Sequence, residues 1–276
     1  MPCSWPTAPA SRKTKSGAQP ISFGVCPVEV LGDHQCLPGV LSYGSMHASS
    51  GSAIGQHVTS GAVQWQDVHV VTRTPVDELA RLGVRPGTRV VFSRHWRQPY
   101  RLPDAVAAHF LDDRAPLAAA IAAARILRSR RDALAQDVWF VCTTFEEESN
   151  AGAMYAASRL PGDTTIALEV GPVLEEYGTR LCADPIVNTG DQKGYYTPSV
   201  VRALMRAARR AGYQAQAALL VDFASDASAV MSSGVAARAG CLAIPTENTH
   251  GVEIVLDEGI EACAATLVEY LLEPNG

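Results

Sequence analysis

The sequence contains no apolar run as long as the ~20 residues that a membrane-spanning helix needs, so we expect no membrane partner. Residues 1–19 are rich in Pro, Ser, Ala and Lys but lack the apolar core of a secretory signal, which predicts a disordered tail. An excess of positive charge is also missing: the formal net charge is −5, and the basic residues are dispersed apart from one run over residues 125–131. We therefore expect no nucleic-acid partner.

Closely paired cysteines are absent as well. The seven Cys residues include no Cys-x-x-Cys pair. Three of them, Cys142, Cys241 and Cys263, lie in apolar runs, where free thiols are commonly buried. This cysteine usage predicts a protein of a reducing, cytoplasmic compartment.

What the chain does contain changes in pattern near residue 100. Residues 20–100 hold short β-patterned runs, the first from residue 21, separated by turn residues, which predicts a small β-barrel domain. Residues 101–276 alternate strands with helices, which predicts a layered α/β domain. In this part, Thr197-Pro198 is a strong helix start, and a last helix is expected from Asp257 to Leu272.

An acidic cluster follows one apolar run of the second part. Residues 137–145 are β-rich and largely apolar, which predicts a buried strand, and Glu146, Glu147 and Glu148 come directly after it. Open α/β sheets place their chemistry at the carboxyl ends of strands. Adjacent carboxylates repel one another, so a cation is expected to hold them. A solvated, acidic helix start explains the same residues, because acids suit a first turn.

Further polar residues stand at other strand ends. Asp112 and Asp113 precede an Ala-rich helix, Glu169 ends an apolar run, and His250 follows another. Hard oxygen ligands with an imidazole suit Zn, Mn or Co. Two such ions roughly 3.5–4 Å apart form a common hydrolase centre.

Three motifs together carry a family resemblance: Asp-Asp-Arg from Asp112, Glu-Glu from Glu146, and Pro-x-x-x-x-His-x-x-Glu from Pro245. Over residues 39–272 the chain resembles the tetrahedral aminopeptidases, which include the glutamyl and deblocking aminopeptidases. The resemblance implies a zinc-exopeptidase-like α/β domain with a small β-barrel. It also implies a metal-dependent aminopeptidase that acts on peptides, with two divalent ions (Zn, Co or Mn) per subunit and a homo-oligomeric assembly.

Residue roles follow from the same resemblance. It implies four metal ligands: Asp112, Glu147, Glu169 and His250. Asp112 would bridge the two metals, Glu169 stands where the family usually has Asp, and Glu146 would be the general base. Asp113 would follow Asp112 across a strained, cis peptide, and Arg114 would tie the loop down. Asp226 lies in a Ser-Asp-Ala run that resembles a Thr-Asp-Ala site motif.

Two departures from the family pattern keep two functions open. No His-x-Asp occurs in this sequence, whereas the family carries a metal-binding His-x-Asp in a segment before the barrel. Residues 148–150 also depart from the usual neutral, Gly-containing continuation of the Glu-Glu motif. The chain is therefore expected to be an aminopeptidase, as written or as part of a longer gene product, with at most one strong metal site. The alternative is a non-catalytic paralogue that acts as a binding or assembly subunit.

Overall fold

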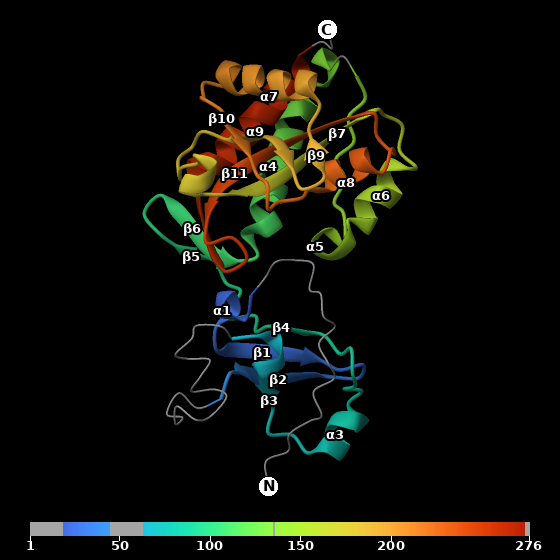
Figure 1. Cartoon of the computed structure of the whole chain (residues 1–276), viewed down its shortest axis with the longest axis vertical. Helices are drawn as coiled ribbons and strands as arrows, with labels where there is room; N and C mark the ends of the chain where they lie inside the picture. The colour runs from blue at the N-terminus through green and yellow to red at the C-terminus, as the bar shows by residue number, and fades with distance from the viewer. Residues whose placement is uncertain (1–18, 45–62, 135, 274–276) are drawn as a thin grey trace. The chain divides into compact units, whose positions relative to one another are not determined.

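The computed structural model describes residues 19–44, 63–134 and 136–273 (Figure 1). The internal contacts of the chain divide it into two compact units, residues 1–98 and 99–276. Residues 1–18 of the predicted tail lie outside the described part of the chain, so the prediction of disorder there stays a prediction.

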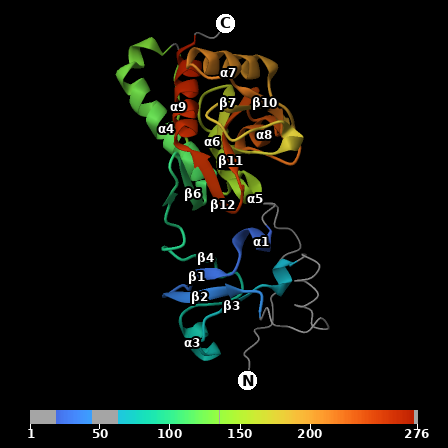
Figure 2. The same cartoon turned by 90° about the vertical axis from the view of Figure 1, so that its left-hand side faces the viewer.

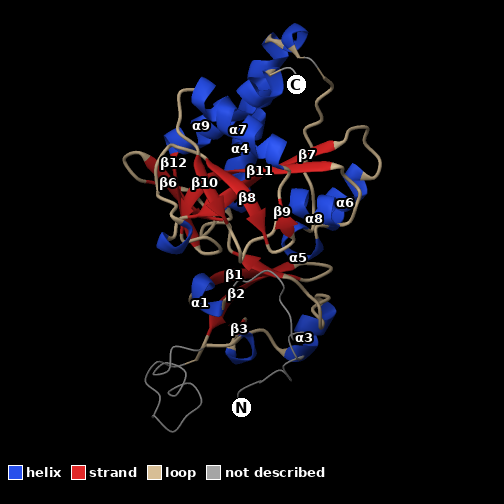
Figure 3. Ribbon diagram, turned by 45° about the horizontal axis from the view of Figure 1, so that its top comes forward, coloured by secondary structure: helices blue, strands red, loops and turns tan. Residues whose placement is uncertain are grey.

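The first unit is built on a four-stranded antiparallel sheet (Figure 3). Its strands are β1 (Cys26–Leu31), β2 (Cys36–Ser42), β3 (His69–Val71) and β4 (Val90–Phe92), in the order β3-β2-β1-β4. The helical segments are α1 (Pro20–Phe23), the 3-10 helix η1 (Trp65–Asp67) and α3 (Val76–Arg81). The first strand begins at Cys26 and not at residue 21, because the preceding residues form a short helix with Pro20 at its first position.

The second unit contains an eight-stranded sheet. Its strands are β5 (Tyr100–Arg101), β6 (Ala105–His109), β7 (Thr164–Pro172), β8 (Ile186–Asp191), β9 (Gly194–Tyr195), β10 (Gln216–Leu219), β11 (Arg238–Glu247) and β12 (Val252–Leu256). The main path runs β10-β8-β11-β12-β6-β5, while β9 pairs with β8. Strand β7 runs parallel to β11 along the edge opposite β8.

Helices cover both faces of this sheet (Figure 2). Helices α4 (Leu111–Ser129), α7 (Pro198–Arg210) and α9 (Asp257–Leu272) pack together on one face. Helix α8 (Asp226–Ser232) covers the other face, and α6 (Ala151–Ala157) packs against α8. The remaining helical segments are η2 (Arg131–Ala133), α5 (Glu146–Ser149) and η3 (Glu175–Tyr177). The layered α/β architecture and the two predicted helix starts are thus confirmed.

The prediction of a buried strand over residues 137–145 was wrong. This segment forms no strand, and Trp139 is 55% exposed. The physical reason is that an apolar β-rich run becomes a buried strand only beside a hydrogen-bonded neighbour. Within the described residues, none pairs with this segment, and none pairs with the edge of β7 that faces away from β11. Cys142 is accordingly exposed, contrary to expectation, whereas Cys241 and Cys263 are buried as predicted.

Candidate metal centre

Unusual backbone turns set up the candidate site. Four residues beside it have a positive φ without being glycine: Phe110 (62°), Phe145 (60°), Asn150 (54°) and His250 (65°). Such conformations cost free energy and persist where the surrounding structure fixes them, often at functional sites.

The turn after β6 presents two carboxylates. The Asp112–Asp113 peptide is cis, as expected, and both residues have non-helical backbone angles at the start of α4. Arg114 donates hydrogen bonds to the carbonyl oxygen of Phe110, at 2.7 Å, and to that of His109. The guanidinium therefore ties the end of the strand to the first turn of the helix.

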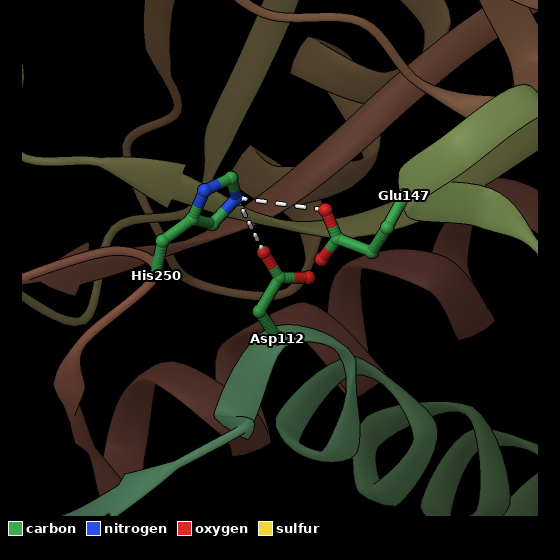
Figure 4. A group of neighbouring side chains, drawn as sticks. All are labelled: Asp112, Glu147 and His250. Carbon is green, nitrogen blue, oxygen red and sulfur yellow. Dashed lines mark ion pairs between the residues drawn. The ribbon is translucent and has the colours of Figure 1, made fainter. Parts of the chain in front are cut away.

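The structure brings Asp112, Glu147 and His250 together (Figure 4). One ligand atom from each lies within 4.8 Å of the others. The His250 Nε2 atom is 3.5 Å from Asp112 Oδ2 and 3.8 Å from Glu147 Oε2. These side chains come from the start of α4, from α5 and from the loop after β11, so three distant segments meet at one point.

A second group shares one of these residues. Oxygen atoms of Asp112, Asp113 and Glu169 also lie within 4.8 Å of one another. Glu169 is buried in β7, and Asp112 stands between the two groups. The four ligands implied by the family resemblance do not include Asp113, but the structure places its carboxylate among the potential ligands.

Glu253 was missed as a functional residue. Its side chain is 1% exposed, and its two oxygens accept hydrogen bonds from the backbone nitrogens of Asp112 and His250, both at 2.9 Å. One carboxylate therefore fixes the backbone of two potential ligands. The signal was present in the sequence, because Glu253 is the last residue of the Pro-x-x-x-x-His-x-x-Glu motif.

Glu146 lies next to these groups but in neither of them. Its Oε1 accepts a hydrogen bond of 2.9 Å from the Asn150 amide nitrogen. The same nitrogen is 3.1 Å from Asp226 Oδ1, and Asp226 Oδ2 accepts a 2.6 Å hydrogen bond from the Thr143 hydroxyl. Asp226 thus lies on the Glu146 side of the site. His109, the other nearby imidazole, is buried in β6 and belongs to neither potential ligand group.

The electrostatics of the site call for a cation. Burial, reinforced by the neighbouring Asp112 carboxylate, raises the pKa of Asp113 to about 9. Burial, with the adjacent Glu147, raises the pKa of Glu146 to about 8. Burial and Asp112 raise the pKa of Glu147 to about 7, and the hydrogen bond to Asp112 raises that of His250 to about 9. Closely spaced, partly buried carboxylates resist ionisation unless positive charge compensates them, and divalent ions do so with these donor types.

A cleft of about 530 Å³ adjoins the carboxylates. Asp112, Asp113, Glu146, Glu147, Glu169 and Asp226 line it. Its other walls are formed by β7, residues 136–143 and apolar side chains of α4 and α9, such as Leu117 and Leu267. The site therefore opens into a space in which a small molecule or a short peptide could contact both acidic and apolar groups.

Comparison with known proteins identifies the family. The sequence profile of the M42 glutamyl aminopeptidases matches residues 17–265, which is most of the chain. The chain belongs to the M42 glutamyl aminopeptidase family. Among curated proteins, none matches this family member at a significant level.

Solved structures of aminopeptidases share the fold of this M42 family member. A TET aminopeptidase from a marine sediment thaumarchaeon is 17% identical, with a TM-score of 0.81 over 92% of this chain and 72% of the other. The TET1 peptidase of Pyrococcus horikoshii is 21% identical, with a TM-score of 0.77 over 91% and 72%. An aminopeptidase from Desulfurococcus kamchatkensis is 20% identical, with a TM-score of 0.76 over 90% and 68%. None of the helices in the described residues is long and apolar enough to cross a membrane.

Proposed function

We propose that this M42 family member is a metal-dependent aminopeptidase that removes N-terminal residues from peptides. The observation that carries the proposal is the pair of potential ligand groups that share Asp112, with Glu146 beside them. Carboxylates and an imidazole at such spacing are the donor set of a hydrolytic metal centre.

The two groups define where ions would be held. Asp112, Glu147 and His250 would hold one divalent ion, and Asp112, Asp113 and Glu169 would hold the other. Zn, Co and Mn all accept this mixture of oxygen and nitrogen donors. When bound, such ions acidify a water molecule and polarise a scissile carbonyl group.

Glu146 is the residue that would move the proton. Its Oε1 is engaged by Asn150, which leaves Oε2 to accept a proton from the attacking water and to pass it to the leaving amine.

A carboxylate outside the two ligand groups would favour peptides with a free N-terminus. Asp226 lines the same cleft and belongs to neither group, so its carboxylate would remain to complement the positive charge of a peptide's α-ammonium group. An acylated peptide lacks that charge and is expected to be a poor substrate.

The two potential ligand groups differ in the number of neutral nitrogen donors, so we expect them to differ in their affinity for metal. The group with His250 combines an imidazole with two carboxylates, as catalytic zinc sites do. The other group contains carboxylates alone and shares Asp112. We therefore expect one strong site and a weaker second site.

The test is metal content by mass spectrometry beside aminopeptidase turnover, after addition of Zn, Co or Mn. Turnover is expected to require added metal and to be abolished in Glu146→Gln. Glu148→Gln is the matched control, because Glu148 is the exposed neighbour in the same acidic run. A folded, metal-loaded chain that hydrolyses no peptide would favour a non-catalytic binding subunit.

We also propose a homo-oligomeric assembly. The Pyrococcus horikoshii TET1 peptidase can assemble into a tetrahedron or a large octahedral shell. Size-exclusion chromatography with light scattering tests this, since a monomer has a mass of 29.3 kDa.

A further inference from the structure

Asn150 occupies an unusual position between α5 and α6. Asn150 adopts the left-handed backbone conformation, with φ of 54°, and the residue is only 6% exposed. Its backbone nitrogen donates a 2.8 Å hydrogen bond to the Phe145 carbonyl oxygen. The turn is therefore closed by the main chain, and the side chain is available for another purpose.

The Asn150 amide lies between two carboxylates. Its nitrogen is 2.9 Å from Glu146 Oε1 and 3.1 Å from Asp226 Oδ1. An amide NH2 group has two hydrogens, so it can donate one to each acid. Glu146 and Asp226 repel each other, and a neutral donor between them offsets that repulsion and fixes their separation.

Asp226 is itself held from the opposite side. The Thr143 hydroxyl donates to its second oxygen at 2.6 Å, and the adjacent Ser225 caps α8 by accepting from the backbone nitrogen of Ser228 at 3.1 Å. The bridge from Asn150 therefore connects Glu146 to a carboxylate that a helix terminus and a hydroxyl keep in place.

We propose that Asn150 is a positioning residue for peptide hydrolysis, which fixes Oε1 of Glu146 so that Oε2 faces the reacting water. The inference rests on the proposed function, because it takes Glu146 as the general base. Asparagine suits the position for two reasons. It tolerates the left-handed backbone better than most residues, and it supplies two N–H groups without adding charge.

Substitutions at Asn150 distinguish the role of the side-chain amide from that of the left-handed backbone. Glycine keeps the left-handed turn and removes the amide, whereas alanine removes the amide and strains the backbone. Aspartate keeps the shape but brings a third negative charge without N–H donors. If the amide positions Glu146, glycine, alanine and aspartate all lower activity; if only the backbone matters, glycine does not.

The experiment measures kcat and KM of the full, metal-loaded chain for a peptide substrate. Asn150→Gly is expected to lower kcat by about 10- to 100-fold, the range expected when a catalytic group is displaced by a fraction of an ångström to one ångström. KM should change less than about twofold and metal content should stay that of the wild type, because the ligand groups do not include Asn150.

Asn248→Gly is the matched control. Asn248 also has a positive φ, of 58°, but its amide nitrogen faces the Val252 carbonyl oxygen at 3.5 Å. The same change there is expected to leave kcat within about twofold.

The outcomes are distinct. Wild-type kcat in Asn150→Gly, with Glu146→Gln inactive, overturns the positioning role and leaves the proposed function intact. If the wild-type chain shows no turnover with any added metal, the proposed function is refuted and the inference falls with it.

If circular dichroism shows that the Asn150 variants do not fold, the variant Thr143→Val tests the hydrogen-bond network instead. It releases the other side of Asp226 and is expected to lower kcat by about threefold at constant KM; an unchanged kcat contradicts the network.

Discussion

At the scale of single residues, the site depends on groups that do not themselves belong to the potential ligand sets. Glu253 accepts two hydrogen bonds from the backbone nitrogens of two potential ligands, Asp112 and His250, and Arg114 secures the turn that carries Asp112. Such supporting contacts set where ligand atoms lie, and their loss commonly weakens metal binding by about 10- to 100-fold.

Glu253→Gln is predicted to weaken metal binding within that range. Glutamine retains one acceptor oxygen, but its NH2 group opposes one of the two backbone N–H donors and so loosens either Asp112 or His250. Competition with a chelator measures the change. The control is Glu258→Gln, at an exposed position on α9. Equal affinities for the wild type and Glu253→Gln would show that the backbone holds its shape without this carboxylate.

At the scale of elements, the segment 137–143 has no regular secondary structure and pairs with no described strand. It exposes Trp139, Phe140 and Val141, and it lines the same cleft as β7. Exposed apolar groups gathered in this way are a site for non-specific binding.

Substitution of this surface is predicted to change dye binding without changing stability. Trp139→Gln combined with Phe140→Ser should lower the fluorescence of a hydrophobic dye and alter the free energy of unfolding by less than about 1 kcal/mol, because little apolar area leaves the core. Leu242→Ala is the contrasting variant, since Leu242 is 0% exposed and its truncation should cost about 2–5 kcal/mol. Undiminished dye fluorescence in the double variant would place the dye site elsewhere.

At the scale of the whole molecule, the chain consists of two compact units, and we propose that they are separate domains. A fragment of residues 99–276 should retain the helical circular dichroism of α4, α7 and α9, which pack on one another and on the sheet of their own unit. Loss of that signal in the fragment, with the full chain folded, would show that the first unit is needed for the second to fold.

The acidic centre makes stability depend on pH in the metal-free protein. The folded-state pKa values of Asp113, Glu146 and Glu147 are raised to about 9, 8 and 7, and that of His250 is raised to about 9. A raised pKa means that the folded state binds the proton more tightly than the unfolded state. The resulting stability is full below the unfolded-state pKa and is lost as the pH rises through the folded-state value.

The melting temperature of the metal-free chain is therefore predicted to fall as the pH rises from about 5 to about 9, and bound divalent metal should reduce this dependence. Each tenfold difference in proton affinity between the folded and unfolded states corresponds to about 1.4 kcal/mol. Thermal melts with and without metal measure it. A metal-free melting temperature that is flat or rises over this range would contradict the prediction.

Much of this arrangement could be predicted because local signals agreed with the tertiary structure. Pro198 after Thr197 fixes a helix start by its own geometry, and the apolar face from Asp257 to Leu272 matches the helix that forms. The residues that the family resemblance singled out, such as Asp112, Glu147 and His250, do meet in space.

The remainder depended on information that a local pattern does not carry. Residues 137–145 have the composition of a strand, but a strand also needs a neighbour at a distant place in the sequence. The roles suggested for Glu253 and Asn150 depend on hydrogen bonds to residues in other turns, and spacing alone does not reveal which carboxylate or amide will accept or donate them.

The one-sided pairing of β7 has a consequence for hydrogen exchange. Arg238 donates its amide hydrogen to the Asp163 carbonyl, and Val173 donates to the Thr246 carbonyl, so the odd-numbered residues between them direct their backbone groups toward β11. The even-numbered amides, those of Thr164, Ile166, Leu168 and Val170, point to the edge with which no described strand pairs. Deuterium uptake along β7 should therefore alternate from residue to residue, fast at even positions and slow at odd ones, and uniform protection would reveal a partner on that edge.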